Sequence, residues 1–228
     1  SIACPPIAKD RLKRFFMPYK TSSEHSNNDA LKLSEKYGFQ LDIVDISAPA
    51  DAFIKICENT TPLRKGNIMA RCRMIILFDK AAENKGIVIG TTNRTELLLG
   101  YGTWYGDTAS SINIIGELYK REVYRVSNAA EMVESIIKKA PTADLWPGQT
   151  DEAELGFTYE LIDNILYDIE QQHLCRNELY EKYDKESVDK IIKRVVSNSF
   201  KRYTPFICQS GIYKRSVIDE NIFLNLDK

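Results

Sequence analysis

The segment Gly86–Gly90 (GIVIG) most constrains the fold, because it is apolar throughout and lies between polar stretches. Continuous apolar character is typical of strands in parallel sheets, whose two faces are both covered by helices. Arg14–Met17 and Leu41–Ile46 also have the character of strands. These three segments therefore predict a parallel sheet with flanking helices.

Helical spacing of apolar residues occurs between the predicted strands, in Asn28–Tyr37, Asp51–Asn59 and Ile68–Ala82. Gly38 directly follows the first of these segments, at a position where glycine commonly ends a helix. The resulting order is strand, helix, strand, helix, helix, strand. This order is the pattern of an α/β fold with a parallel sheet.

The second half of the chain has a different texture, with four segments of helical pattern: Glu117–Val126, Ala129–Lys138, Thr158–Gln172 and Ser187–Ser199. We expect these segments to form a C-terminal helical part. Lys138–Gly156 combines prolines, glycines and small polar residues, which predicts a long loop. Loops of this length in a compact domain are more often functional than idle.

The composition is that of a globular protein, with 228 residues, 43% apolar residues and a net charge of −1. This length fits one domain, and the balanced charge gives no attraction to nucleic acid. No apolar run approaches the roughly 20 residues needed to cross a bilayer, so we expect no membrane partner and a cytoplasmic location. The five cysteines are scattered and form no CxxC pair, which argues against disulfides and zinc sites.

Small polar residues follow the predicted strand Gly86–Gly90 directly, beginning with Thr91, Thr92 and Asn93. In an open parallel sheet, ligands bind beyond the carboxyl ends of the strands, so these residues are expected on the ligand-facing rim. Thr92 or Asn93 could equally cap a helix that begins near Glu96. The position therefore predicts a binding site, a helix cap, or both.

Glu96 has two interpretations at this position. In the first turn of a helix, a carboxylate interacts favourably with the helix dipole. The same carboxylate could bind Mg²⁺ that faces the phosphates of a nucleotide, because Mg²⁺ is usually held by one or two carboxylates together with phosphate oxygens. The residues alone leave both interpretations open.

The stretch Gly100–Asp107 (GYGTWYGD) mixes glycines with aromatic residues, which suits a sharp turn or a close approach to a ligand. It is not a GxGxxG fingerprint, so a Rossmann dehydrogenase is not indicated. Arg71 and Arg73 lie two positions apart on a predicted helix and do not share a face, so one of them faces the core or a ligand. Lys120 and Lys201 could stabilise phosphate or carboxylate charge, but composition does not distinguish them from solvated lysines.

Four stretches of the sequence resemble one known family when they are taken in order. They are GNIMARCRM at 66–74, GTTNRTELLLGYGTWYGD at 90–107, INIIGELYK at 112–120 and APTADLWPGQTDEAELGFTYELID at 140–163. Together they are similar to the ammonia-dependent NAD synthetases, with a match that runs from Phe16 to Phe206. The resemblance implies an adenine nucleotide alpha hydrolase-like (Rossmann-like) fold of the ATP-pyrophosphatase type, a single domain over residues 1–228, and a homodimer.

The resemblance also implies the activity of a ligase that forms a C–N bond. In this reaction the nicotinate carboxylate of deamido-NAD attacks the α-phosphate of ATP, pyrophosphate leaves with magnesium, and ammonia then displaces AMP to give NAD. By their places in the motifs, the implied site residues are Thr91, Lys120 and Thr142 for ATP, Arg71 and Lys201 for deamido-NAD, and Glu96 for Mg²⁺. The turn Gly100–Asp107 is implied to form a wall of the deamido-NAD site.

The sequence departs from the family pattern at Trp104, Ser111 and Phe200, where many relatives have lysine, aspartate and histidine. We expect some substrate contacts to differ at these positions. The family's phosphate-binding loop, SGGxDS, is not found in the 228 residues, and we expect it to precede Ser1. Two alternatives stay open: another enzyme of the ATP-pyrophosphatase type, and a catalytically inactive nucleotide-binding homologue.

Overall fold

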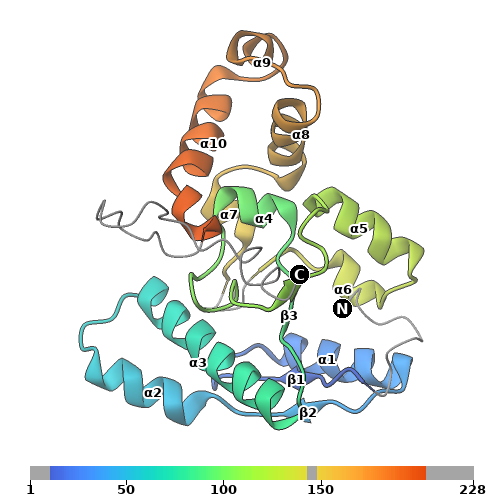
Figure 1. Cartoon of the computed structure of the whole chain (residues 1–228), viewed down its shortest axis with the longest axis vertical. Helices are drawn as coiled ribbons and strands as arrows, with labels where there is room; N and C mark the ends of the chain where they lie inside the picture. The colour runs from blue at the N-terminus through green and yellow to red at the C-terminus, as the bar shows by residue number, and fades with distance from the viewer. Residues whose placement is uncertain (1–10, 143–147, 204–228) are drawn as a thin grey trace, which may run out of the picture.

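The computed structural model describes residues 11–142 and 148–203, so the first ten residues, the ADLWP of the predicted loop and the tail after Tyr203 lie outside the described residues. Figure 1 labels most of the elements. In chain order they are β1 Phe15–Phe16, α1 Glu24–Tyr37, β2 Asp42–Ile43, α2 Ser47–Ile56, α3 Pro62–Glu83, β3 Ile89–Gly90, α4 Arg94–Leu99, β4 Ile112–Asn113, α5 Lys120–Ala129, α6 Glu134–Lys138, α7 Asp151–Leu155, α8 Tyr159–Glu170, α9 Arg176–Lys182, α10 Lys185–Ser197 and η2 Ser199–Arg202.

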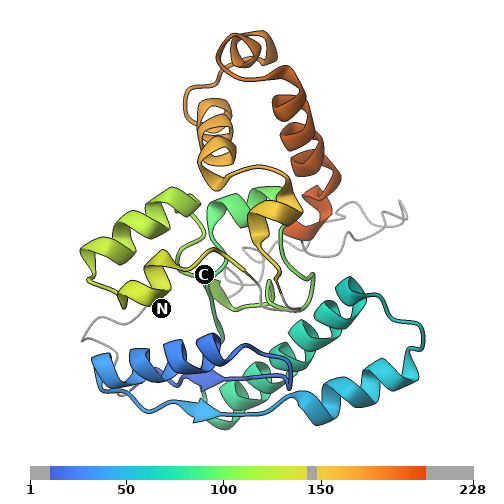
Figure 2. The same cartoon turned by 180° about the vertical axis from the view of Figure 1, so that it is seen from behind.

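The elements form two groups at opposite ends of the long axis of the molecule (Figures 1 and 2). One group contains β1 and β2 with α1, α2 and α3, and α1 lies in front of the two strands when the molecule is seen from behind (Figure 2). The other group consists of α8, α9 and α10. The helices α4, α5, α6 and α7 lie between the two groups, so residues of the first half meet residues of the last third there.

The strands pair in parallel, as the sequence predicts, β1 with β2 and β3 with β4. Three backbone hydrogen bonds join segments 14–18 and 42–46: Asp42 N to Arg14 O (3.0 Å), Val44 N to Phe16 O (2.9 Å) and Ile46 N to Pro18 O (2.9 Å). The predicted strands are longer than the observed ones, because each observed strand pairs with only one neighbour among the described residues and regular pairing covers two residues. The strand β4 was not predicted.

The helices of the first half begin earlier than predicted, and side-chain N-caps mark the starts of α1 and α3. Ser23 accepts a hydrogen bond from Ser26 N and starts α1, which ends at Gly38 with a left-handed φ of 58°. Thr61 caps α3 in the same way, with Pro62 in the first turn where its missing N–H costs nothing. The predicted stop at Gly38 is confirmed, and both missed starts carry the usual N-cap signals.

The C-terminal helical part is confirmed, and its core also includes side chains from α4 and from the start of α5. Its buried side chains are Leu99, Tyr119, Leu155, Tyr159, Ile162, Ile165, Leu166, Leu179, Val188 and Ile191. Two helices were missed: α7 lies inside the predicted loop Lys138–Gly156, and α9 lies between two predicted helices. Within residues 11–142 and 148–203, no helix is both long enough and apolar enough to span a membrane.

Candidate functional site

A cavity of about 920 Å³ opens at the carboxyl end of β3. Thr91 and Thr92, the two residues that follow this strand, line it together with side chains from α3, α5 and η2. Its volume lies within the range of small-molecule sites, which is roughly 300–1,000 Å³. The rim residues are therefore found beside a ligand-sized space, where their position after a parallel strand predicts them.

Five of the six predicted site residues line this cavity: Thr91, Glu96, Lys120, Thr142 and Lys201. The sixth, Arg71, is exposed on α3 and is not among the lining residues. Arg73 is the arginine of this helix that lines the cavity, and its Nε donates to the carbonyl of Met17 at 2.9 Å. The structure thus resolves the choice that the sequence left open, with Arg73 facing the cavity and Arg71 exposed.

The lining of the cavity combines apolar and charged side chains. Its apolar members include Met74, Leu77, Val123, Met132 and Ile136. Besides the predicted residues, its charged members are Arg73, Lys139, Arg194, Asp107, Asp151 and Glu154. Apolar surface suits a planar base, and convergent cations suit phosphates, so the lining has the chemistry of a nucleotide site.

The start of α4 fixes the first part of this site. Asn93 Oδ1 accepts from Glu96 N at 3.0 Å, and Glu96 Oε2 accepts from Asn93 N at 3.1 Å, which forms a reciprocal capping box. Asn93 is only 2% exposed. The cap interpretation of Asn93 is therefore correct, and the box holds the Glu96 carboxylate at one oxygen while the other faces α5.

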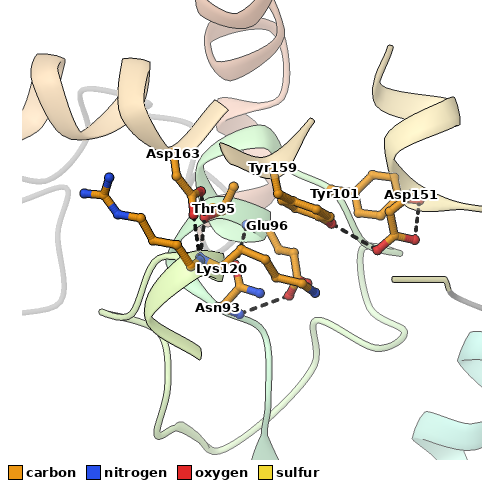
Figure 3. A network of polar contacts seen from close by, with 9 residues as sticks. Asn93, Thr95, Glu96, Tyr101, Lys120, Asp151, Tyr159 and Asp163 are labelled. Carbon is orange, nitrogen blue, oxygen red and sulfur yellow. Dashed lines mark hydrogen bonds and ion pairs between the residues drawn. The ribbon is translucent and has the colours of Figure 1, made fainter. Parts of the chain in front are cut away.

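The second oxygen of Glu96 meets Lys120, the first residue of α5. The distance from Lys120 Nζ to Glu96 Oε1 is 2.9 Å, and each side chain is 17% exposed (Figure 3). Lys120 Nζ also lies 4.9 Å from the ring centroid of Tyr159, within cation–π range. A polyphosphate that enters the cavity therefore meets a positioned ammonium and a positioned carboxylate side by side.

Glu96 can bind a magnesium ion only if most of the other ligands of that ion come from outside the protein. Among residues 11–142 and 148–203, no group of three His, Cys, Asp or Glu side chains could hold a metal. Mg²⁺ commonly binds to one or two carboxylates and takes its other ligands from water and substrate phosphates. The donor set of this cavity therefore suits Mg²⁺ that arrives with a nucleotide, not a metal held by the protein alone.

The turn Gly100–Asp107 is held by the two basic residues that the resemblance assigns to deamido-NAD. Lys201 Nζ donates to the carbonyls of Gly100 at 2.8 Å and Gly102 at 3.0 Å. Arg71 Nη2 donates to the carbonyl of Trp104 at 3.1 Å. Burial, and then the nearby charge of Arg194, lower the pKa of the Lys201 ammonium. The structure thus brings both residues to one turn, although they are far apart in the sequence.

The backbone of this turn adopts conformations that most residues avoid. Gly100 ends α4 with a left-handed φ of 60°, which glycine adopts without strain. Tyr105 has a φ of 57°, which is uncommon for a residue with a side chain and costs of the order of 1 kcal/mol. Strained residues of this kind concentrate at binding sites, and this one lies beside the cavity-lining Gly106.

Two of the three departures from the family pattern contact each other next to this turn. The Trp104 ring stacks on Tyr105 with centroids 4.5 Å apart, and Phe200 meets Trp104 edge-on at 5.2 Å. An aromatic pair thus occupies the two positions where the family resemblance leads us to expect a lysine and a histidine. The third departure, Ser111, is exposed, and its backbone N–H donates to Val88 at 2.9 Å.

A cluster of carboxylates and tyrosines on the cavity wall was not predicted from the sequence. The Asp151 carboxylate lies within hydrogen-bond distance of the hydroxyls of Tyr101 (3.1 Å) and Tyr159 (3.0 Å), as Figure 3 shows. Glu154 accepts from the Tyr101 hydroxyl at 2.6 Å. Burial, and then the neighbouring carboxylates, raise the pKa of both phenols, which therefore stay protonated and donate. Asp151 and Glu154 lie on α7. Because the sequence pattern did not predict this helix, it did not indicate these two carboxylates as site residues.

Comparison with known proteins identifies the family of this fold and site. The sequence profile described as NAD synthase matches residues 2–205. An NH(3)-dependent NAD(+) synthetase from Chlorobium phaeobacteroides (strain BS1) is 45% identical over 204 residues, which cover 89% of this chain and 74% of that protein. A match of this extent includes every predicted site residue.

Solved structures agree with this result. The NH3-dependent NAD synthetase from Campylobacter jejuni, in complex with nitrate, is 35% identical with a TM-score of 0.72, over 86% of this chain and 76% of that one. A structure described as NMN synthetase from Francisella tularensis is 31% identical with a TM-score of 0.75, over 84% of this chain and 76% of that one. The parallel strands with flanking helices are therefore those of the adenine nucleotide alpha hydrolase-like fold.

Proposed function

Because this chain belongs to the NAD synthase family, we propose that its cavity is the site where ATP and deamido-NAD meet and where ammonia is incorporated. The activity is the ATP-dependent amidation of deamido-NAD to NAD, so the protein is a ligase that forms a C–N bond in NAD biosynthesis. The observation that carries the assignment to this cavity is the convergence of Thr91, Glu96, Lys120, Thr142 and Lys201 on one ligand-sized space.

The reaction requires activation of a carboxylate, because a carboxylate does not react directly with an amine. An oxygen of the nicotinate carboxylate forms a bond to the α-phosphorus of ATP, and the bond from that phosphorus to the pyrophosphate oxygen breaks. The nitrogen of ammonia then bonds to the acyl carbon, AMP leaves with the carboxylate oxygen, and the nitrogen loses a proton. The protein contributes mainly by positioning the reactants and stabilising charge on the phosphates.

The ATP phosphates are proposed to bind beside Lys120 and Glu96. Lys120 supplies a positive charge that can leave Glu96 and move to a phosphate oxygen, because its ammonium is held by one carboxylate at 2.9 Å. Thr91 and Thr142 line the same cavity and are proposed as further contacts of ATP. Mg²⁺, when bound with ATP, would neutralise charge that develops on the departing pyrophosphate, and Glu96 would hold it.

Deamido-NAD is proposed to lie against the turn Gly100–Asp107, with Arg71 and Lys201 as its basic contacts. We expect Lys201→Met to raise the KM for deamido-NAD about 10-fold or more, because the change removes a charged hydrogen-bond donor worth roughly 1.5–3 kcal/mol and releases the turn. Arg71→Met should act in the same direction but less, because this side chain is exposed. Steady-state kinetics with each substrate varied separately provides the measurement.

Lys190→Met is the matched control for this pair, since Lys190 is 60% exposed on α10, forms an ion pair with the nearby Glu186 and does not line the cavity. Its kinetic constants should equal those of the wild type. A Lys201 variant in which the KM for deamido-NAD stays unchanged, or in which only the KM for ATP rises, would contradict the assignment.

The overall activity is tested by product analysis with the purified full-length protein. Incubation with deamido-NAD, ATP, Mg²⁺ and ammonium should yield NAD, AMP and pyrophosphate in equal amounts. Deamidated NMN belongs in a parallel incubation, because one solved relative is described as an NMN synthetase. Release of ADP and phosphate in place of AMP and pyrophosphate, or preferential formation of NMN, would overturn the proposal as stated.

A homodimer is proposed through the exposed faces of α2 and α3. Five large apolar side chains on these helices are exposed: Phe53 (47%), Ile56 (75%), Leu63 (59%), Ile75 (54%) and Phe78 (40%). Apolar side chains gathered on adjoining helices are typical of association surfaces. Light scattering at micromolar concentration should give twice the chain mass, and Ile56→Asp should lower it toward the monomer. A monomeric wild type would refute the dimer.

The expected cytoplasmic location stays a prediction that cell fractionation can test.

A further inference from the structure

Asp163 is a fully buried carboxylate on α8, with 0% exposure, and it contacts two elements that begin at the cavity. Its Oδ1 accepts from the hydroxyl of Thr95, in the first turn of α4, at 2.5 Å. Its Oδ2 accepts from the backbone N–H of Arg121, in the first turn of α5, at 2.8 Å. A single side chain thus joins the starts of both helices from behind the cavity (Figure 3).

Thr95 extends this connection to the residue that faces the phosphate space. Thr95 is itself 0% exposed, and its hydroxyl oxygen accepts from the backbone N–H of Lys120 at 2.9 Å while its proton points to Asp163. Thr95 is also the residue before Glu96. The chain of contacts therefore runs from Asp163 through Thr95 to Lys120 and, in parallel, through Arg121 to the same turn of α5.

The carboxylate form of this residue is what the two contacts require. Both contacts donate to Asp163, so each of its oxygens must accept. An asparagine offers one acceptor oxygen and one donor NH2 at these two positions, so it would leave either the Thr95 hydroxyl proton without this acceptor or the N–H of Arg121 facing another donor. Burial of a carboxylate is unfavourable unless hydrogen bonds compensate it. Burial raises the pKa of Asp163, against the opposing hydrogen bonds from Thr95 and Arg121.

We propose that Asp163 is a positioning residue of the ATP site, which sets the relation of Glu96 to Lys120 without touching either substrate. This inference rests on the proposed function, because it takes Glu96 and Lys120 as the residues that meet Mg²⁺ and the ATP phosphates. The direct backbone link between the two segments is a hydrogen bond from Arg94 N to Leu118 O at 2.8 Å. That link joins the first residue of α4 to the segment before α5, and Glu170 of α8 also binds both Arg94 and the Tyr119 hydroxyl there. Asp163 and Thr95 are the side chains that bind the backbone N–H groups of Arg121 and Lys120, in the first turn of α5.

The test compares Asp163→Asn, Thr95→Val and Thr95→Ser in the full-length protein. Displacement of a catalytic group by an ångström can lower the rate about 100-fold, so we expect a loss of roughly 10- to 100-fold in kcat/KM for ATP in Asp163→Asn and Thr95→Val. The KM for deamido-NAD should change less than that for ATP. Thr95→Ser keeps the hydroxyl and should restore most of the activity, which a role in packing alone would not predict.

Asp168→Asn is the matched control, because Asp168 lies on the same helix and is 7% exposed, but contacts Lys182 and Tyr183 at the far end of the helical part. This variant should lower the unfolding temperature and leave both KM values unchanged. If Asp163→Asn and Thr95→Val lower the unfolding temperature in the same way with unchanged kinetic constants, Asp163 is merely structural and the proposal fails. If Asp163→Asn does not fold, the contrast between Thr95→Val and Thr95→Ser decides.

Calorimetric titration with ATP and Mg²⁺, without deamido-NAD, separates this inference from the proposed function. A wild type that binds ATP but forms no NAD would overturn the function, and a weaker affinity of Asp163→Asn and Thr95→Val would still support the positioning role. Equal ATP affinity in the wild type and all three variants, together with equal rates of NAD formation, would overturn the positioning role alone.

Discussion

Glu96→Gln is expected to lower the rate of NAD formation about 100- to 1,000-fold, because loss of one preorganised electrostatic contact at a developing charge typically costs this much. The change is suited to the question, since glutamine serves in the third position of a capping box as well as glutamate does. Asn93 N therefore keeps an acceptor in the place of Glu96 Oε2. The variant removes the charge next to Lys120 while the start of α4 is preserved. Initial rates at rising Mg²⁺ concentration provide the measurement, and half-saturation should shift upward.

Glu178→Gln is the control for this prediction, because Glu178 accepts from the backbone N–H of Cys175 at 2.7 Å in the same capping arrangement at the start of α9. It lies outside the residues that line the cavity. Its loss of charge should leave the rate and the Mg²⁺ dependence unchanged. The metal assignment fails if Glu96→Gln has the wild-type rate and the wild-type Mg²⁺ dependence.

The rim of the site could be predicted from the sequence because it depends on local rules. An apolar strand ends at Gly90, although the expected burial of both its faces is wrong, because Ile87 and Ile89 are 64% and 37% exposed. The residues after a parallel strand lie at the ligand-binding edge of the sheet, so the positions of Thr91 and Glu96 follow from their order in the chain. Gly100 follows an apolar helical run and carries the positive φ that ends α4. The roles proposed for Lys120 and Lys201 rest on the family resemblance, because nothing in the local sequence separates these two lysines from the others.

The helix α7 was missed although its signals are present. Thr150 accepts from Ala153 N as an N-cap, acidic residues fill the first turn, and Gly156 closes the helix with a φ of 79°. Five residues form too short a segment for apolar periodicity, and the surrounding prolines and glycines indicated a loop. Boundaries set by caps therefore carry more information here than the hydrophobic pattern does.

The connection through Asp163 could not be predicted from the sequence, because Thr95 and Asp163 are 68 positions apart and only the tertiary structure joins them. A partial signal exists on α8, where Tyr159, Ile162 and Leu166 are buried at helical spacing. Asp163 falls on this stripe, and a carboxylate on a buried stripe requires donors from elsewhere. The identity of those donors depends on how α4 and α5 pack against α8.

Lys120→Met should lower kcat about 100-fold and raise the KM for ATP, because the change removes the cation that we place beside the phosphates and keeps a side chain of similar length. Glu96 then loses its cationic partner, and because each side chain of this pair is only 17% exposed the cost in stability should be a few kcal/mol, up to about 3. Thermal unfolding followed by circular dichroism shows whether the variant is folded at the assay temperature. Steady-state rates with ATP varied provide the measurement.

Lys20→Met separates a catalytic cation from an ordinary ion pair. Lys20 pairs with Asp51 at 2.6 Å, closer than the 2.9 Å of Lys120 and Glu96, but its side chain is 56% exposed and does not line the cavity. Surface pairs of this kind contribute roughly 0–1 kcal/mol, so its kinetic constants should match those of the wild type.

The double variant Glu96→Gln with Lys120→Met should lose less activity than the product of the two single losses, because both residues act on the same phosphates. Losses that simply multiply would place the two side chains in separate roles and contradict a shared ATP site.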